Sequence, residues 1–357
     1  MKKSTSKDVA KLANVSQATV SMVLNKKENV SFSEDTVEKV LRAAKELNYN
    51  VPSTAKTPNG DKKKLLALFT PTMINPYYPM LNQAIEETAI PLGYNVLVCN
   101  SYRNQEIEKY YLELFTDNLV AGIIYTFTPT FPELIEALSP TIPVVIIGEK
   151  EHALEIDTVG LNSYKSGMLV ADHLNELGHK DIAFITTPLE NMTLSRKQRY
   201  QGILDKLTEH GLEKRLIVKA STDERETSDS VYEIESGYQL TLELLERSSS
   251  VSAIIGVNDI TACGIMNALN EKGYTIPEQI SVCGFDNIFI SSLLHPKLTT
   301  IDHCIQHRAK TATTIVIEKI EKRQNAVPHS YEHSPSIYKI EYEPQLIVRD
   351  STGPYER

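Results

Sequence analysis

From Leu65 onward, short apolar runs alternate with amphipathic stretches of helical spacing, and this alternation constrains the fold more than any other feature. The runs predict strands at residues 65–70, 94–99, 121–126, 144–147, 182–186, 216–219, 253–257 and 281–285. Helical patterns separate most of them, at residues 79–91, 104–118, 131–138, 164–177, 194–210, 231–247, 259–272 and 303–322. Such alternation predicts parallel sheets covered by helices. Eight strands with their helices are more than one doubly wound domain usually contains. We therefore expect two doubly wound lobes, with a ligand cleft at the carboxyl ends of the strands.

Charge is distributed unevenly along the 357 residues, whose net charge is −9. Residues 1–64 hold 13 basic and 7 acidic side chains, net +6, and the remainder holds 24 and 39, net −15. A basic head on an acidic body suggests a small nucleic-acid-binding module, although a solvated lysine-rich start would give the same count. No apolar run approaches the roughly 18 residues of a membrane span, and the N-terminus lacks a signal-peptide core, so we expect a cytoplasmic protein.

The head has the pattern of three short helices. Apolar residues at helical spacing predict a first helix over residues 6–13, ended by Asn14 in the left-handed conformation. Ser16 is placed to cap a second helix over residues 17–25, and Ser33 to cap a third. Two short helices joined by three residues form a helix-turn-helix, which aims its second helix at a DNA major groove.

Small hydrogen-bonding side chains gather near the start and outer face of the second predicted helix. Such groups suit phosphate oxygens, although helix caps and ordinary surface residues have the same composition. The predicted phosphate contacts are Thr5, Ser16, Thr19, Ser21 and Asn25.

The segment "KDVAKLANVSQATVSMVLN", residues 7–25, resembles the DNA-binding signature of the lactose/galactose repressor family. The rest of the chain follows the family order as far as "LIVRDST" near its end. The resemblance implies that Gln17, Ala18 and Met22 face the base edges. Most members carry an arginine where this chain has Met22, and methionine offers only apolar contact, so the family's usual operator rules do not carry over.

The resemblance also divides the chain into a helix-turn-helix domain (1–50), a hinge linker (51–64) and an effector-binding and dimerisation body (65–357). In the linker, Ala55 and Lys56 match the small and basic positions of a hinge helix that enters the minor groove. Pro58 stands where the family places a wedging leucine, and it disfavours helical angles at the preceding residue. A flexible tether is therefore an equal alternative.

The family's body is periplasmic-binding-protein-like, with two lobes joined by three crossings. We place these crossings near Asn162, Ile290 and Asn325. The first lobe is then residues 65–162 and 291–325, and the second is residues 163–290 and 326–357.

Several polar side chains follow predicted strands and could hold a polar ligand. Tyrosines stack on sugar faces, the planar fork of Arg199 can bind hydroxyls or a carboxylate, and Asp286 can accept two hydroxyl hydrogen bonds. The role of Arg199, and the aromatic contact at Tyr232, follow from the resemblance. The predicted effector residues are Asn75, Tyr77, Tyr78, Arg199, Tyr232, Asn258, Asp286 and His303. Gly148 stands where the family often has an acid, and Asn162-Ser163 replaces the commoner Asp-Asn.

Motifs of catalysis and of metal binding are missing from the pattern. The sequence has no GxSxG, GxxxxGK[ST] or GxGxxG, and His303 and His307 lack a third spaced ligand. Cys99, Cys263, Cys283 and Cys304 form no CxxC and are expected to be reduced thiols. We therefore expect neither an enzyme nor a cofactor or metal site.

The sequence predicts a ligand-responsive transcriptional regulator, and a repressor of sugar or carbon-source genes in particular. It would bind a palindromic operator in double-stranded DNA as a homodimer. Its effector would be a sugar or a sugar-derived metabolite. We expect no membrane partner. Two alternatives stay open: a regulator controlled by a protein co-effector, and a cytoplasmic solute-binding protein of the same body fold.

Overall fold

Two compact units make up the chain in the computed structural model, and they divide between Lys62 and Lys63. The structure describes residues 5–24, 32–47, 64–115, 119–149, 155–189, 192–221, 232–247, 250–325 and 336–355. The predicted linker residues, including Ala55, Lys56 and Pro58, lie outside these ranges, as does Asn25.

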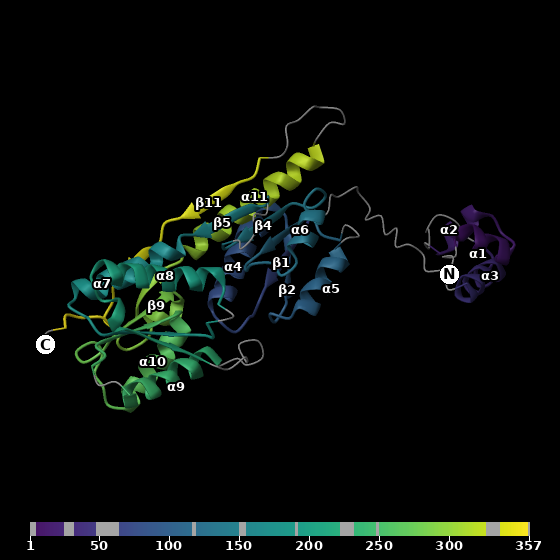
Figure 1. Ribbon diagram of the computed structural model, residues 1–357. Helices are drawn as coiled ribbons and strands as arrows, with labels where there is room; N and C mark the ends of the chain where they lie inside the picture. The colour runs from purple at the N-terminus through teal and green to yellow at the C-terminus, as the bar shows by residue number, and fades with distance from the viewer. Residues whose placement is uncertain are drawn as a thin grey trace. The chain divides into compact units, whose positions relative to one another are not determined.

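The first unit is the predicted helix-turn-helix with a third helix packed against it (Figure 1). Its helices are α1 (Ser6–Ala13), α2 (Gln17–Leu24) and α3 (Glu34–Glu46). One fully buried valine from each helix forms the centre of a small core: Val9, Val20 and Val40. Asn14 ends α1 in the left-handed conformation with φ 54°, as the sequence predicts.

The second unit contains two six-stranded sheets in the part of the chain that the structure describes. The first sheet is entirely parallel, in the order β11-β5-β4-β3-β1-β2. Its strands are β1 (Leu65–Thr70), β2 (Asn95–Asn100), β3 (Gly122–Tyr125), β4 (Val144–Ile147), β5 (Asp157–Leu161) and β11 (Lys339–Tyr342). Helices α4 (Tyr77–Ala89) and α11 (Ile305–Asn325) cover one face, and α5 (Gln105–Phe115) and α6 (Pro132–Leu138) cover the other.

The second lobe repeats this plan, in the order β12-β10-β9-β8-β6-β7, with only β12 antiparallel. Its strands are β6 (Ile182–Thr186), β7 (Leu216–Ala220), β8 (Ala253–Gly256), β9 (Ser281–Asp286), β10 (Thr299–Asp302) and β12 (Gln345–Ile347). Helices α7 (Ser163–Glu176) and α8 (Leu194–Glu209) cover one face, and α9 (Tyr232–Arg247) and α10 (Asp259–Glu271) cover the other. Short 3₁₀ turns occupy residues 90–92, 213–215 and 289–292.

The strand pairing corrects the predicted lobe boundaries. All eight predicted strands form, but β5, β10, β11 and β12 were not predicted. Because β10 pairs with β9, the second lobe continues to Asp302, and because β11 pairs with β5, residues 339–342 belong to the first lobe. The crossings predicted near Ile290 and Asn325 are therefore wrong. The chain crosses after Asn162, between β10 and α11, and between β11 and β12.

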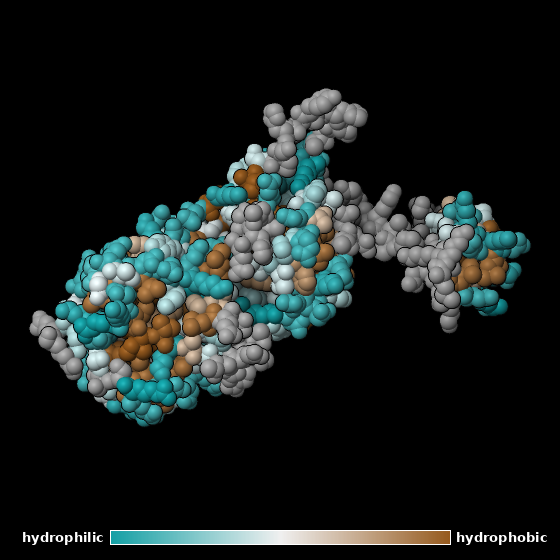
Figure 2. Space-filling view, viewed as in Figure 1, coloured by the Kyte–Doolittle hydropathy of each residue, from teal (hydrophilic) through white to brown (hydrophobic). Residues whose placement is uncertain are grey.

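Apolar surface gathers on the second lobe, around the segment labelled β9 in Figure 1, as Figure 2 shows in brown. Large apolar side chains exposed on this lobe include Tyr164, Phe289 and Leu293. Those on the first lobe include Ile90 and Tyr110. Among the helices that the structure describes, none combines the length and the apolar character needed to cross a membrane.

Helices α7 and α8 approach closely because a glycine lies at each side of their contact. A Cβ atom at Gly167 would lie 2.1 Å from the carbonyl oxygen of Arg199, and one at Gly202 would lie 2.0 Å from the carbonyl oxygen of Tyr164. Neither distance is possible for real atoms, so any larger residue forces the helices apart. This contact sets the position of Arg199, a predicted effector residue in α8.

We expect Gly167→Ala to lower the free energy of unfolding by about 1–3 kcal/mol, the usual cost of an overpacked core site. Urea denaturation followed by circular dichroism measures it. Gly160→Ala is the matched control, because its Cβ would meet only the carbonyl oxygens of Gly148 and Ile340, at 3.7 and 3.9 Å. Equal stabilities of the two variants would show that the α7–α8 contact is not tight.

Candidate functional site

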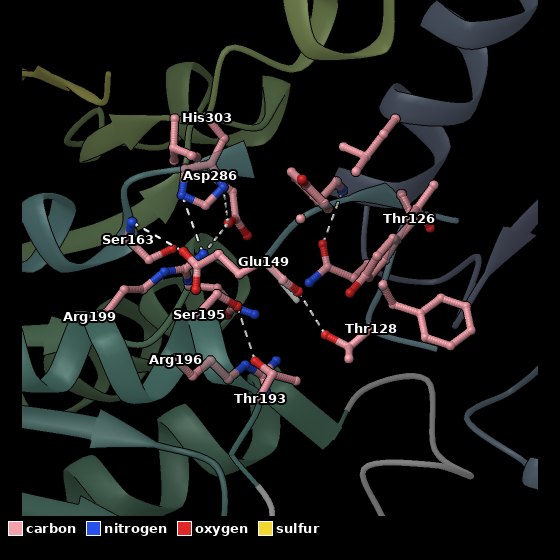
Figure 3. A pocket seen from close by; sticks show the side chains of 18 of the residues that line it. Thr126, Thr128, Glu149, Ser163, Thr193, Ser195, Arg196, Arg199, Asp286 and His303 are labelled. Carbon is pink, nitrogen blue, oxygen red and sulfur yellow. Dashed lines mark hydrogen bonds and ion pairs between the residues drawn. The ribbon is translucent and has the colours of Figure 1, made fainter. Parts of the chain in front are cut away.

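A cavity lies between the two lobes, at the carboxyl ends of their strands. It encloses about 820 Å³, counting the solvent at its mouth. Figure 3 shows Arg199, Asp286 and His303 converging on one side of it, and Thr126 and Thr128 facing them from the other. The residues that line it are Asn75, Tyr77, Tyr78, Arg103, Thr126, Phe127, Thr128, Ile147, Gly148, Glu149, Leu161, Ser163, Thr193, Ser195, Arg196, Arg199, Asn258, Asp286, His303 and Arg308.

Three buried side chains, two from the second lobe and His303 from the crossing after β10, form a polar cluster in this cavity. The Nδ1 atom of His303 lies 3.1 Å from Oδ1 of Asp286, and its Nε2 lies 3.3 Å from NH2 of Arg199. Arg199 also donates to the carbonyl oxygen of Val257 at 2.8 Å, and its guanidinium lies over the ring of Phe285, 5.0 Å from the centroid. Its NH2 is 3.7 Å from Asp286, which supplies the opposite charge.

The neighbours of His303 determine its protonation state. A guanidinium can only donate, so Nε2 must accept from Arg199, and the single ring proton on Nδ1 then donates to Asp286. Burial and the nearby charges of Arg199 and Arg308 hold the pKa of His303 well below its ordinary value. The neutral ring therefore relays a hydrogen bond from the arginine to the carboxyl group.

Asp286 is held in an unusual backbone conformation, with φ 117°, and Asn287 follows at φ 53°. Such angles are costly for residues other than glycine and persist where neighbours fix them. Arg349 donates to Oδ1 of Asn287 at 2.6 Å and anchors this turn. Burial raises the pKa of Asp286, and the charge of Arg199 acts in the opposite direction.

Glu233, at the start of α9, joins the lobes. Its Oε1 accepts from Arg196 and from Asn258, each at 2.8 Å, and both donors belong to the second lobe. Its Oε2 accepts from Nδ2 of Asn75 at 2.8 Å, and Asn75 lies in the loop after β1 of the first lobe. One carboxylate thus holds the cleft closed at this edge.

Glu149 provides a second link between the lobes. It follows Gly148, whose φ of 136° is readily adopted only by glycine, and this turn directs the chain after β4. Oε1 of Glu149 accepts from the backbone N–H of Ser163 at 3.3 Å. With its amide turned so that Nε2 faces the carboxylate, Gln198 of α8 donates to Oε1 and Oε2 at 2.8 and 2.6 Å. Burial raises the pKa of Glu149.

Seven of the eight predicted effector residues line the cavity, and Tyr232 does not. Tyr232 is buried, and its hydroxyl donates to Oγ of Ser221 at 2.8 Å. The side-chain amide oxygens of two others accept hydrogen bonds from the protein backbone. Oδ1 of Asn75 accepts from the N–H of Tyr77 at 3.0 Å, and Oδ1 of Asn258 caps α10 by accepting from the N–H of Thr261 at 2.8 Å.

Sequence reasoning missed several cavity residues, and two kinds of signal could have revealed them. Thr126 directly follows β3, and Glu149 lies two residues after β4, where ligand groups of parallel sheets lie. Arg308 lies on the apolar face of α11, three residues after Ile305 and four before Ala312. A lone arginine at such spacing is a marker of a buried polar site.

The described DNA-contacting residues that were predicted for the head lie on and before α2. Gln17, Ala18 and Ser21 are exposed, and Met22 is half-buried. Nε2 of Gln17 donates to Oγ of Ser6 at 2.8 Å.

Two predicted phosphate contacts, Thr5 and Ser16, also serve as helix caps, and a third, Thr19, bonds to one of them. The N–H and Oγ1 of Thr5 donate to Oδ2 of Asp8 at 2.8 and 2.6 Å. The N–H of Thr19 donates to Oγ of Ser16 at 3.0 Å, and the two hydroxyls share a hydrogen bond at 2.8 Å. These side chains therefore make the hydrogen bonds expected of capping residues. Their contact with DNA phosphates stays a prediction.

The neutral state of His303 leads to a testable pH dependence. Below about pH 6.5 an imidazole in the unfolded chain gains a proton that the buried ring does not, so falling pH favours unfolding. Between about pH 7.5 and 5.5, wild type should lose roughly 1 kcal/mol of unfolding free energy relative to His303→Gln. Urea titrations of both proteins across this range measure the difference. Parallel pH profiles would mean that folding leaves the pKa of His303 unchanged, and would contradict a neutral buried ring.

Comparison with known proteins places the chain in a family. Residues 5–52 match the family of bacterial regulatory proteins, lacI family, and residues 171–352 match the periplasmic binding protein-like domain. The chain is 32% identical over 349 residues to the HTH-type transcriptional repressor PurR of Haemophilus influenzae, covering 97% of this chain and 98% of that one.

Two solved structures share the fold. A LacI family transcriptional regulator from Enterococcus faecium with bound ribose aligns with a TM-score of 0.69 and 26% identity, over 82% of this chain and 100% of that one. The lac repressor dimer bound to operator aligns with a TM-score of 0.69 and 25% identity, over 99% of this chain and 100% of that one. The head, the two-lobed body and the near full-length relatives agree: the chain belongs to the lacI family of bacterial regulatory proteins.

Proposed function

We propose that this protein represses transcription by binding an operator through its head, and that a small polar effector in the cleft controls this binding. The observation that carries the proposal is the closed, charged cleft between the lobes of a chain that begins with a helix-turn-helix. A repressor acts on the chromosome, so we place the protein in the cytoplasm.

The exposed start of α2 is the surface that reads the operator. Gln17, Ala18 and Met22 contact base edges in the major groove, and the hydroxyls around them contact phosphates. Methionine at position 22 favours an apolar partner, such as a thymine methyl group, over the guanine that an arginine would read. Ala55 and Lys56 belong to the linker and approach the minor groove.

A homodimer is the assembly that fits this function, and the lac repressor relative is a dimer on its operator. Large apolar side chains exposed on both lobes supply surface for a subunit contact (Figure 2). Two heads at a fixed spacing then read two half-sites of a palindrome. A change in lobe orientation alters that spacing, so ligand binding and DNA binding become coupled.

The effector is a sugar or a sugar-derived metabolite. The tyrosines at the start of α4 offer flat faces for a sugar ring, and Arg199, Asp286 and His303 offer hydrogen bonds to hydroxyls. A relative of the same fold holds ribose. An enclosed cavity with converging polar groups favours a small molecule over a protein co-effector, which would need an open surface.

The base-reading role of α2 is tested by Gln17→Ala. We expect operator affinity to fall by about 1–3 kcal/mol, the value of one good side-chain contact to a base, while affinity for unrelated DNA is unchanged. Fluorescence anisotropy with an operator selected from random duplexes measures both. Ser6→Ala is the matched control, because it removes the hydrogen bond from Gln17 but keeps the amide. Equal losses on both DNAs would place Gln17 on a phosphate.

The effector site is tested by Arg199→Ala and Asp286→Ala. Each leaves a charged partner unpaired in a closed cleft, so effector affinity should fall roughly 10–150-fold, while DNA binding without effector persists. Calorimetric titration with the tightest ligand from a panel of sugars and sugar derivatives measures the loss. Tyr232→Phe, which alters a buried tyrosine outside the cavity, should bind normally. Unchanged affinity in both cleft variants would remove these residues from the site.

A further inference from the structure

Arg308 is a buried cation that forms no ion pair with any carboxylate of the described residues. It lies in the first turns of α11, is 3% exposed and lines the cavity between the lobes. Among the described residues, no carboxylate oxygen lies within ion-pair distance of it. The other two buried arginines of the cavity differ, because Arg196 pairs with Glu233 and Arg199 pairs with Asp286.

The hydrogen bonds of Arg308 are long and go only to neutral acceptors. Its NH1 donates to the hydroxyl of Tyr77 at 3.2 Å and to the carbonyl oxygen of His303 at 3.4 Å. Its NH2 donates to the carbonyl oxygen of Val159 at 3.4 Å, and its Nε has no partner. A guanidinium has five N–H donors, and a buried charge is costly without an opposite charge and full hydrogen bonding.

Glu149 is the remaining acid of the cavity, and it is bound elsewhere. Its carboxylate accepts from the N–H of Ser163 and from the amide of Gln198, both neutral donors. Burial raises the pKa of Glu149, and the charges of Arg199 and Arg308 act in the opposite direction. The raised pKa lowers the repulsion that Glu149 exerts on a second acid in the cavity. Tyr77 accepts from Arg308, so its own hydroxyl proton is available to an acceptor in the cavity.

We propose that the effector carries an acidic group, a carboxylate or a phosphate, that binds Arg308 and the hydroxyl of Tyr77. This deepens the proposed function and rests on it, because it assigns a charge to the same ligand. The planar fork of an arginine matches both kinds of anion, so the shared chemistry is an oxyanion on a polyhydroxylated small molecule. Arg199, Asp286 and His303 then hold the hydroxyl end.

Calorimetric titration of the full-length protein tests the charge with matched ligands. The probes are ribose, ribonate and ribose 5-phosphate, and glucose, gluconate and glucose 6-phosphate. In at least one series the acid or the phosphate should bind at least about 10-fold more tightly than the neutral sugar, as expected for one charge-assisted contact. Comparing the affinities of the sugar acids with those of the sugar phosphates shows whether the site prefers a carboxylate or a phosphate.

Two variants assign the preference to Arg308. Arg308→Met keeps an unbranched buried side chain and should lose roughly 10-fold or more of the affinity for the anionic ligand, with little change for the neutral sugar. Arg308→Lys keeps the charge and should retain most of the preference. A folded state for each is checked by its thermal unfolding transition, and if Arg308→Met does not fold, loss of the preference in Tyr77→Phe decides instead.

The outcomes separate this inference from the proposed function. If a neutral sugar binds best and Arg199→Ala abolishes its binding while Arg308→Met does not weaken any ligand, the acidic effector is wrong and the cleft assignment stands. If no probe binds, or if Arg199→Ala leaves every affinity unchanged, both are overturned.

Discussion

The closed cleft depends on the carboxylate of Glu233, because that one group accepts hydrogen bonds from both lobes. Arg196 and Asn258 hold it from the second lobe, and Asn75 reaches it from the first. A carboxylate has about four acceptor positions, and three of them are used here by donors from three separate segments. Glu149, which follows β4, adds a second link between the lobes through Ser163 and Gln198.

Much of the fold follows from periodicity alone. Apolar runs such as residues 182–186 are long enough to be recognised as buried strands, and the helical stripes between them are regular. The strands that were missed are short, and two of them, β11 and β12, are half-exposed, so no apolar run marks them. Because those short strands decide which sheet receives the chain after a crossing, the lobe boundaries could not be placed correctly.

The site residues at the ends of strands could be predicted from the sequence. The residues whose position depends on tertiary packing could not. Asp286 ends β9 and Asn258 lies two residues after β8, and parallel strands bring their carboxyl ends together. Tyr232 was misplaced because the direction of a side chain at a helix start is set by tertiary contacts. The same limit applies to Asn75, whose place beside the cavity was predicted while its bond to Glu233, from a helix far along the chain, was not.

His303 lies in the segment that crosses from β10 to α11, and Cys304 beside it has a left-handed φ of 51°. The side chain that contacts Arg199 and Asp286 is therefore carried by one of the segments that join the lobes. A ligand that competes for either hydrogen bond of this ring therefore acts directly on a residue of the crossing. Occupancy of the cleft and the conformation of a lobe crossing are thus linked through one side chain.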